Sequence, residues 1–416
     1  MLRSLVLAIT CVAALTASAD APSVEEFVAR HWRAPLPPQG PAPARFSPVE
    51  ASLAPEACGS CHPAQLADWR TSLHARTMGP GVSGQLVEMH AREPEDALGC
   101  YTCHAPLAEQ RPILGRDAGH AKNPVFDAAL AERGLVCAAC HVRAHERFGP
   151  PRRDGSLVPP APRETLPHNG VTRTPTFLKS EFCRGCHQFA PGGLALNGKL
   201  LENTYAEWKA SRFAREGVQC QDCHMPDRRH LWRGVHDVEM VRSGLTITVR
   251  PEGEIAGGDT VSATLRVRST RVGHAFPTYV VPRVVLRGEQ LDASGAPVEA
   301  TRRERIIARE VALDLSREVR DSRLLPGAAV SLVYRVPRQP RAESLRLQVV
   351  VEPDAFYMRF FEALLAQGMG RGEPQIRAAL DAARRSALTV FEKTLPLAGA
   401  PPARGAAAPP QHGRGG

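Results

Sequence analysis

Beyond its N-terminus the chain has no apolar run of about 18 residues, which excludes a membrane-spanning helix from the mature protein that we predict. The apolar stretch at residues 5–15 is about half the length that crosses a bilayer. It follows Arg3 and precedes the small residues Ala-Ser-Ala at positions 17–19. This arrangement is typical of a secretory signal. We therefore predict that residues 1–19 are a signal peptide cleaved after Ala19 and that the protein is exported to a bacterial periplasm.

Lysine is also scarce. Only five of the 52 basic residues are lysine, so the formal net charge of +9 rests on arginine. A basic balance alone could indicate a nucleic acid or a membrane surface as a partner. The predicted export argues against nucleic acid. The cysteines suggest another use for the arginines, because a forked guanidinium group suits a carboxylate.

Cysteine is absent after residue 223, and Cys11 would leave with the signal peptide. The ten cysteines that remain form five Cys-x-x-Cys pairs, and histidine follows each pair directly. The motifs, numbered first to fifth, are Cys58-Gly-Ser-Cys61-His62, Cys100-Tyr-Thr-Cys103-His104, Cys137-Ala-Ala-Cys140-His141, Cys183-Arg-Gly-Cys186-His187 and Cys220-Gln-Asp-Cys223-His224. Exported chains with an even cysteine count often contain disulfides, and paired Cys-x-x-Cys can form zinc ribbons. Neither explanation requires a histidine after every second cysteine.

The Cys-x-x-Cys-His pattern is the attachment signature of c-type haem. Two thiols one helical turn apart add to the two vinyl groups of one porphyrin, and the adjacent imidazole reaches the iron. We therefore predict five covalently bound c-type haems, with the ten cysteines as attachment points and the five motif histidines as proximal iron ligands. Haem propionates would pair with many of the arginines and bring the protein near neutrality. A basic docking face for an acidic partner is the alternative use of that charge.

The spacing of the motifs constrains the fold. They share residues 58–224, about 33 residues for each haem, which is too little polypeptide for a conventional core. We expect short helices and irregular segments wrapped around stacked haems. After residue 240 the sequence alternates in strand fashion. The predicted strands cover residues 245–250, 260–269, 278–292, 328–337 and 344–354.

The predicted fold class is therefore mixed: a mainly α-helical and irregular multihaem cytochrome domain, followed by a β-sandwich-like domain and C-terminal helices. The boundaries that we predict are a signal peptide at 1–19, a proline-rich lead-in at 20–57, a haem domain at 58–240, a β domain at 241–354, a helical segment at 355–396 and a disordered tail at 397–416.

Distal iron ligands decide the function, because a haem with two protein ligands transfers electrons and one with an open position can bind and transform a small molecule. Nine further histidines could serve the five irons. The distal candidates that we favour are His74, His168, His230, His236 and His274. The four that we expect more often to lie on the surface or to bond to a haem propionate are His31, His90, His120 and His145.

An internal repeat supports the first candidate. Residues 67–76 align without gaps with residues 206–215, and both read as short amphipathic helices that carry a tryptophan. His74 in the first copy is replaced by Phe213 in the second. One copy can therefore offer an iron ligand from this position, and the other cannot.

The remaining candidates lie in turns and between strands. His168 is in the turn LPHNG, fifteen residues before the fourth motif. His230 and His236 flank Trp232 just after the fifth motif, and we expect them to serve neighbouring haems, because the chain needs distance to pass from one face of a haem to the other. His274, in VGHAFPT, would clamp the β domain onto the haem domain.

The chain resembles the multihaem c-type cytochromes related to cytochrome c554, in a wider group that includes hydroxylamine oxidoreductase and the ammonia-forming nitrite reductases. The segments that carry the resemblance are CGSCH at 58–62 with WRTSLHA after it, CAACHVR at 137–143, EFCRGCHQF at 181–189 and ENTYAEWKAS at 202–211 running into CQDCHMP at 220–226. VGHAFPT and the strands after it resemble a β domain appended to some members. The resemblance implies stacked haems that pass electrons along the chain. It also implies that His74 is a distal ligand, because Trp-x-x-Ser-x-His usually supplies one in this group.

The catalytic relatives have signatures that this chain does not match. Ammonia-forming nitrite reductases usually carry lysine as the proximal ligand of the active haem, and all five motifs here end in histidine. Hydroxylamine oxidoreductases carry about eight haems, whereas five motifs are present here. Cytochrome c554, however, keeps one five-coordinate haem.

The sequence therefore favours an electron carrier over an enzyme. The leading hypothesis is a periplasmic five-haem cytochrome, mostly bis-histidine and of low potential, that passes electrons between redox partner proteins in the cell envelope. The first alternative is an oxidoreductase that acts on a small nitrogen or sulfur species at one five-coordinate haem. The second is a structural electron-wire subunit of a larger cytochrome assembly.

Overall fold

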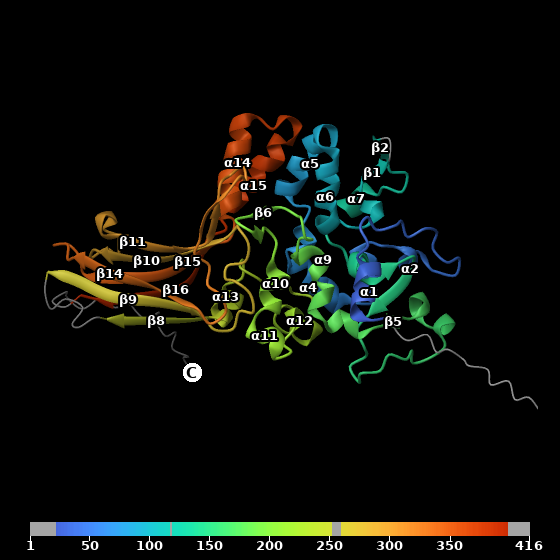
Figure 1. Cartoon of the computed structure of the whole chain (residues 1–416), viewed down its shortest axis with the longest axis horizontal. Coiled ribbons are helices and arrows are strands. Elements are labelled where there is room, and N and C mark those ends of the chain that lie inside the picture. The colour runs from blue at the N-terminus through green and yellow to red at the C-terminus, as the bar shows by residue number, and fades with distance from the viewer. Residues whose placement is uncertain (1–21, 117–118, 252–258, 398–416) are drawn as a thin grey trace, which may run out of the picture.

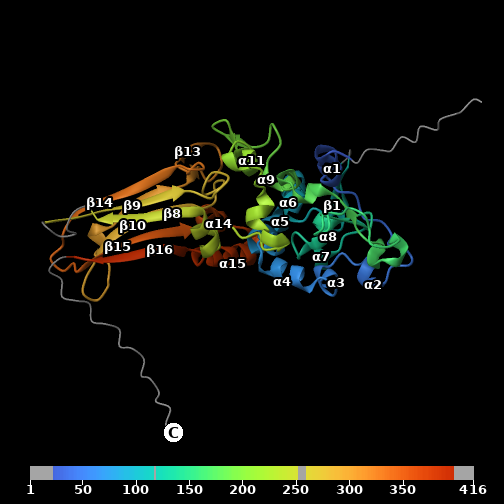
Figure 2. The same ribbon diagram turned by 90° about the horizontal axis from the view of Figure 1, so that it is seen from below.

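The computed structural model describes residues 22–116, 119–251 and 259–397. The predicted signal peptide with Cys11, and the predicted tail apart from Leu397, lie outside these residues. Helices and very short strands form one half of the molecule, and long strands form the other (Figures 1 and 2). The predicted mixed class is therefore confirmed. No helix in the described ranges is both long and apolar enough to cross a membrane.

The half that bears the motifs consists of short helices joined by irregular segments. Its helices are α1 (Val24–His31), α2 (Pro48–Ala51), α3 (Pro55–Gly59), α4 (Pro63–Thr71), α5 (Pro80–Arg92), α6 (Pro94–His104), α7 (Ala128–Ala131), α8 (Cys137–His141), α9 (Arg184–His187), α10 (Thr204–Lys209), α11 (Arg212–Arg215), α12 (Cys220–His224) and α13 (Val238–Gly244). Its short strands are β1 (Ile113–Arg116), β2 (Gly119–Lys122), β3 (Val142–Arg143), β4 (Glu146–Gly149), β5 (Thr172–Arg173), β6 (Ala195–Leu196) and β7 (Lys199–Leu200).

The lead-in expected at residues 20–57 is more ordered than its proline content indicated. Helix α1 begins with a capping box between Ser23 and Glu26, and it buries Phe27, Val28 and His31. Phe27 packs in a cluster with Phe177 and Phe182. The proline-rich composition describes only residues 34–48, and the expectation of an extended lead-in was wrong for the helical part that precedes them.

The other half is built on two antiparallel sheets. One has the order β11-β10-β15-β16 and the other β14-β9-β8, and side chains from both enter one hydrophobic core. The strands are β8 (Leu245–Pro251), β9 (Thr260–Ser269), β10 (Arg283–Leu291), β11 (Arg303–Ile307), β14 (Ala329–Pro337), β15 (Ser344–Glu352) and β16 (Leu388–Pro396), with β12 (Arg309–Val311) and β13 (Glu318–Asp321) as a separate hairpin. All five predicted strands are present, with ends that differ by a few residues.

The C-terminal segment differs from the prediction. Helices α14 (Ala355–Gln367) and α15 (Glu373–Arg384) are present, but residues 388–396 form β16, which pairs with β15. The helical segment predicted to reach residue 396 was therefore wrong beyond Arg384. The sequence LTVFEKTLP contains β-branched residues and buries Val390 in the sheet core, so pairing with an open sheet edge outweighs the helical spacing that precedes it.

A network of buried charges joins the two halves. The side chain of Arg309 in β12 is only 1% exposed and forms an ion pair with Glu318 at 2.9 Å. The same guanidinium donates to the carbonyl oxygens of Leu196, Lys199 and Leu200 in the hairpin β6-β7. These buried hydrogen bonds hold the β half against the motif half.

Candidate functional site

Each motif folds as a helical turn. In the first motif the backbone N–H of His62 donates to Cys58 O at 2.9 Å, and in the fourth His187 N–H donates to Cys183 O at 3.1 Å. The second, third and fifth motifs lie within α6, α8 and α12. All ten cysteines of the motifs are free, and no group of three or more His, Cys, Asp or Glu in the described residues could hold a metal ion.

Three proximal histidines each lie opposite the ring of a different distal candidate. The centroids of His187 and His74 are 6.4 Å apart, those of His141 and His230 are 6.2 Å apart, and those of His224 and His274 are 6.4 Å apart. A metal–imidazole bond is about 2 Å long and the ligating nitrogen lies about 1 Å from the ring centre, so two rings on opposite sides of one iron should be about 6 Å apart. The three spacings therefore fit one iron between each pair.

The protonation state of the paired rings suits iron binding. Burial lowers the pKa of His74 to about 3 and those of His141 and His274 to about 4. All three rings are therefore neutral at pH 7, which is the form that binds a metal. His187 is exposed by surface area, and yet burial lowers its pKa too. Surface exposure and a pKa lowered by burial occur together when a ring faces a space enclosed by the protein, as a haem-bound ring must.

Four of the six histidines in these pairs share a hydrogen-bond pattern. Nδ1 of His141 contacts Phe148 O at 2.8 Å, Nδ1 of His224 contacts Arg233 O at 2.7 Å, and Nδ1 of His274 contacts Ala275 O at 2.9 Å. A carbonyl partner on Nδ1 fixes the ring so that Nε2 is free to bind a metal, which is the usual arrangement around metal-bound histidine. The same pattern holds for His104 with Thr77 O, His168 with Gly170 O and His230 with Arg228 O.

The other histidines use Nε2 for a protein partner instead. The partners are Cys140 O for His31, Tyr101 Oη for His90, Glu95 for His120 and Gly40 O for His145. His236 belongs to this group, because its Nε2 lies 3.2 Å from each carboxylate oxygen of Asp354. The structure does not place His236 opposite a proximal histidine, in contrast to the sequence prediction, because this carboxylate binds the nitrogen that an iron would need.

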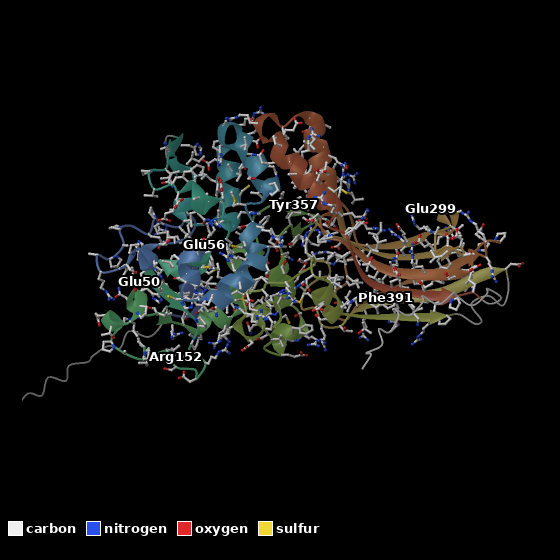
Figure 3. The ribbon with its side chains drawn as sticks, turned by 180° about the vertical axis from the view of Figure 1, so that it is seen from behind. Glu50, Glu56, Arg152, Glu299, Tyr357 and Phe391 are labelled. Carbon is white, nitrogen blue, oxygen red and sulfur yellow. The ribbon has the colours of Figure 1, made fainter. Side chains whose placement is uncertain are left out.

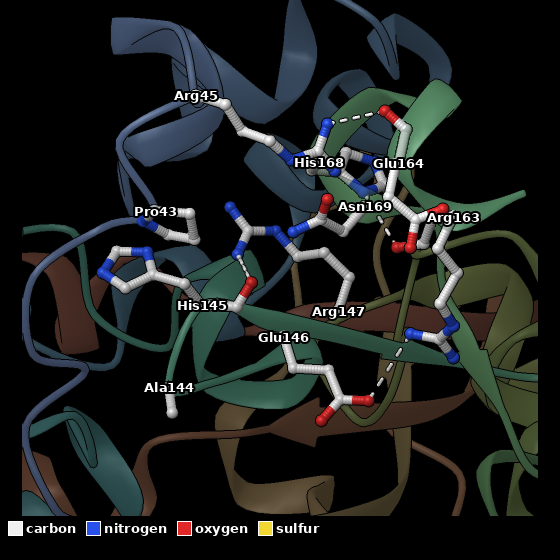
Figure 4. A pocket seen from close by; sticks show the side chains of 11 residues that line it. Pro43, Arg45, Ala144, His145, Glu146, Arg147, Arg163, Glu164, His168 and Asn169 are labelled. Atoms are coloured by element: carbon white, nitrogen blue, oxygen red, sulfur yellow. Dashed lines mark hydrogen bonds and ion pairs between the residues drawn. The ribbon is translucent and has the colours of Figure 1, made fainter.

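His168 is placed beside the first motif. Burial lowers the pKa of His168, and the nearby His62 is among the groups that lower it further. His168 also lines a cavity of about 440 Å³ together with the guanidinium groups of Arg45, Arg147 and Arg163 (Figure 4). Forked guanidinium groups suit carboxylates, so the cavity fits the propionates of a haem held by the first motif.

Contacts between cysteines place the motifs relative to one another. The sulfur of Cys58 lies near that of Cys137, the sulfur of Cys103 near that of Cys186, and the sulfur of Cys183 near that of Cys220. Cys140 of the third motif interacts electrostatically with both cysteines of the fourth. The motifs therefore follow the order first, third, fourth, and the fourth also adjoins the second and the fifth. The fourth motif is the junction.

The surroundings of His104 differ from those of the other proximal histidines. No histidine of the described chain forms a ring contact with His104, which is also true of His62, but the motif of His104 is approached by tyrosines and carboxylates. After burial, Asp354 raises the pKa of Tyr357, and burial with Glu202 and Tyr357 raises that of Tyr279. Burial also raises the pKa of Glu202 to about 6. Figure 3 shows Tyr357 on α14, where that helix meets the motif half.

Several residues of this site were not identified from the sequence. Trp232 lies between two distal candidates, with its ring 4.7 Å from His74 and 5.1 Å from His230. Its position between two histidines in the sequence was a usable signal. Tyr279, Tyr357 and Glu202 had none, because they come from three separate segments that only the tertiary fold brings together.

Comparisons with known proteins agree with the motifs. A family model described as cytochrome c554 and c-prime matches residues 57–142. Cytochrome c-552 of Aliarcobacter butzleri (strain RM4018) is 28% identical over 189 residues, which cover 42% of this chain and only 36% of that relative. The crystal structure of a penta-haem cytochrome c552 from Thermochromatium tepidum has a TM-score of 0.60 and 18% identity, and the match covers 84% of this chain and 100% of that one. Haem as the cofactor is thus confirmed, and the chain is similar to multihaem c-type cytochromes in its motifs and in its fold.

Proposed function

We propose that this protein transfers electrons through five covalent haems, at least four of which have two histidine ligands. The observation that carries the proposal is the spacing of 6.2–6.4 Å between three pairs of histidine rings. The pairs that we assign are His62 with His168, His141 with His230, His187 with His74 and His224 with His274. Two protein ligands leave an iron no open position, so these four sites suit electron transfer rather than catalysis.

A c-type haem supplies one-electron chemistry, and the protein sets its potential through the axial ligands, hydrogen bonds and burial. Carbonyl contacts on Nδ1 hold the rings of His141, His168, His224, His230 and His274 in fixed orientations. Trp232 fills the space between the distal rings of the third and fourth motifs and excludes water there.

The setting of this function is also part of the proposal. We expect the protein to act in the periplasm after removal of residues 1–19 and to exchange electrons with redox partner proteins of the cell envelope. Short helices wrapped around the haems would form one domain. The two sheets that share a core would form a β-sandwich-like domain, whose contribution to electron transfer is the ligand His274.

Electron paramagnetic resonance of the oxidised holoprotein tests this proposal. We expect low-spin ferric signals from at least four of the five haems, because two imidazole ligands give a strong ligand field. A potentiometric titration should place these haems at low potentials, as bis-histidine ligation favours. High-spin signals from two or more haems would contradict the assignment of four histidine pairs.

The surroundings of His104 favour a second candidate function, an oxidoreductase acting on a small nitrogen or sulfur species. Glu202, with its pKa raised to about 6 by burial, could hold or release a proton near neutral pH. Glu202 and Tyr357 both interact electrostatically with cysteines of the second motif. A carboxyl and a hydroxyl beside a haem that lacks a second histidine are the groups that proton-coupled reduction of a small molecule requires.

Nitric oxide binding separates the two candidates. If the haem of the second motif has an open position, the oxidised protein should show one high-spin signal, and nitric oxide should bind to one haem of five in the reduced protein. The Tyr357→Phe variant should keep the high-spin signal and the nitric oxide binding but lose catalytic reduction of the small-molecule substrate. The Tyr205→Phe variant, a change on α10, should keep this activity. A spectrum with only low-spin haems and no nitric oxide adduct would rule out the oxidoreductase.

A further inference from the structure

The segments that carry the distal histidines are mostly irregular. His168 itself has φ of 42°, and His230 follows Asp227 and Arg228, with φ of 51° and 61°. Residues other than glycine avoid this left-handed region, so each such residue must be held by its surroundings. His274 lies between β9 and β10, outside any strand. A ligand on such a segment stays over an iron only if the segment is fixed.

A carboxylate anchors each of these three segments through a backbone N–H. The N–H of His168 donates to Glu50 Oε1 at 2.6 Å, and that of His230 donates to Asp68 Oδ2 at 3.0 Å. The N–H of Ala275, next to His274, donates to Glu207 Oε2 at 3.1 Å. The three carboxylates lie on different helices, α2, α4 and α10, and are far from the histidines in the sequence.

His74 provides an internal contrast. It lies in a 3-10 helix (His74–Arg76) that directly follows α4, so helical backbone geometry already fixes its position. A carboxylate anchor therefore accompanies the distal histidines that regular structure does not hold.

The anchor at His274 is the most extensive. The other oxygen of Glu207 accepts a hydrogen bond from Arg323 at 3.0 Å, and these two side chains are only 13% and 6% exposed. Backbone bonds between Phe276 and Leu324 hold the same segment from its other side. The Glu207 carboxylate thus links α10, the His274 segment and the β half in one buried network.

The His274 segment packs on the second copy of the internal repeat, residues 206–215. A Cβ on Gly273 would lie 3.3 Å from the ring of Trp208 and 3.6 Å from Cβ of Phe213, so the backbone at Gly273 packs directly on both side chains. The copy that has Phe213 in place of a histidine therefore supports His274, which another part of the chain supplies.

We infer that Glu50, Asp68 and Glu207 are positioning residues that set the distal ligands His168, His230 and His274 over their irons. The inference rests on the proposed pairing of these histidines with the first, third and fifth motifs. A hydrogen bond from a backbone N–H to a carboxylate is charge-assisted and stronger than one to a neutral acceptor. Loss of the acceptor frees the segment, and the ring can then leave the iron.

The Glu207→Ala variant is expected to show a high-spin ferric signal from about one haem in five, as the His274→Ala variant should, because a displaced ring leaves one iron five-coordinate. The Glu207→Gln variant keeps an oxygen acceptor and should stay mainly low-spin. Glu216→Ala removes an exposed carboxylate at the end of the neighbouring α11 and should leave the spectrum unchanged. Electron paramagnetic resonance and redox titration of the holoprotein measure these outcomes.

A double variant separates positioning from general damage. Combining Glu207→Ala with His274→Ala should add no second high-spin haem, since both act on one iron; an added one would overturn the inference. If His274→Ala is high-spin but Glu207→Ala is fully low-spin, the positioning inference fails while the ligand assignment stands. If His274→Ala itself stays low-spin, the assignment fails. Should Glu207→Ala not accumulate, Glu50→Ala with His168→Ala as its reference decides the same question at the first motif.

Discussion

The His74→Met variant is expected to trap electrons at the fourth motif, because the equilibrium for their onward transfer becomes roughly a thousandfold less favourable, and so to slow their passage through that motif. Replacing one imidazole by a thioether raises the potential of a haem. A rise of about 0.2 V is well within the range of about 0.8 V that axial ligands span. Since about 59 mV corresponds to a factor of ten in an equilibrium constant for one electron, the equilibrium for leaving that site would become roughly three orders of magnitude less favourable.

The fourth motif gives the largest effect because of its position. Its cysteines lie near cysteines of the second and fifth motifs and near Cys140 of the third. Every route from the first or third motif to the second or fifth therefore passes through it. Electron tunnelling weakens exponentially with distance, so a route that omits this motif is too long to compensate.

The matched control is His274→Met. It makes the same chemical change at the fifth motif, which adjoins only the fourth. It should raise one potential equally but leave transfer from the first motif to the second unchanged. Stopped-flow reduction monitored at the haem bands measures both. Equal slowing in the two variants would show that the fourth motif is not a junction.

The sequence predicted the chemistry of this protein better than its architecture. Cys-x-x-Cys-His encodes the attachment of a haem within five residues, so the proximal site needs no tertiary information. Five strands between residues 245 and 352 were also predictable, because alternation is a local property, whereas β11, β12 and β13 were not predicted. By contrast, α1 is hidden by the prolines after it, and β16 forms because β15 offers an edge.

The distal candidates show where local information ends. His230 and His236 have similar contexts beside Trp232, and only the fold distinguishes them: one ring faces His141, and the other binds Asp354. Their difference depends on a carboxylate 118 residues away from His236. The His274 segment, by contrast, carried a usable signal, because a histidine in a break between strands has no role within a sheet.

The Arg309→Leu variant is expected to lower the free energy of unfolding by about 3 kcal/mol. Removing one partner of a buried ion pair typically costs about 3–5 kcal/mol, because the remaining groups stay buried without a partner. Here Glu318 keeps Lys199 at 2.9 Å, which places the cost at the lower end. The carbonyl oxygens of the hairpin β6-β7 have no such substitute, and their lost hydrogen bonds loosen the contact between the two halves.

Arg320→Leu on the same hairpin is the matched control, and the comparison isolates burial as the cause. Arg320 and Glu310 form an ion pair with the same 2.9 Å separation as Arg309 and Glu318, but their side chains are 51% and 34% exposed rather than 1% and 6%. An exposed pair contributes about 0–1 kcal/mol. Chemical denaturation of the oxidised holoprotein, followed by tryptophan fluorescence and the haem bands, should therefore show a large loss for Arg309→Leu and almost none for Arg320→Leu. Similar losses for the two variants would mean that the loss of any ion pair in the hairpin has this effect. The buried junction with β6-β7 would then not determine how firmly the β half is held.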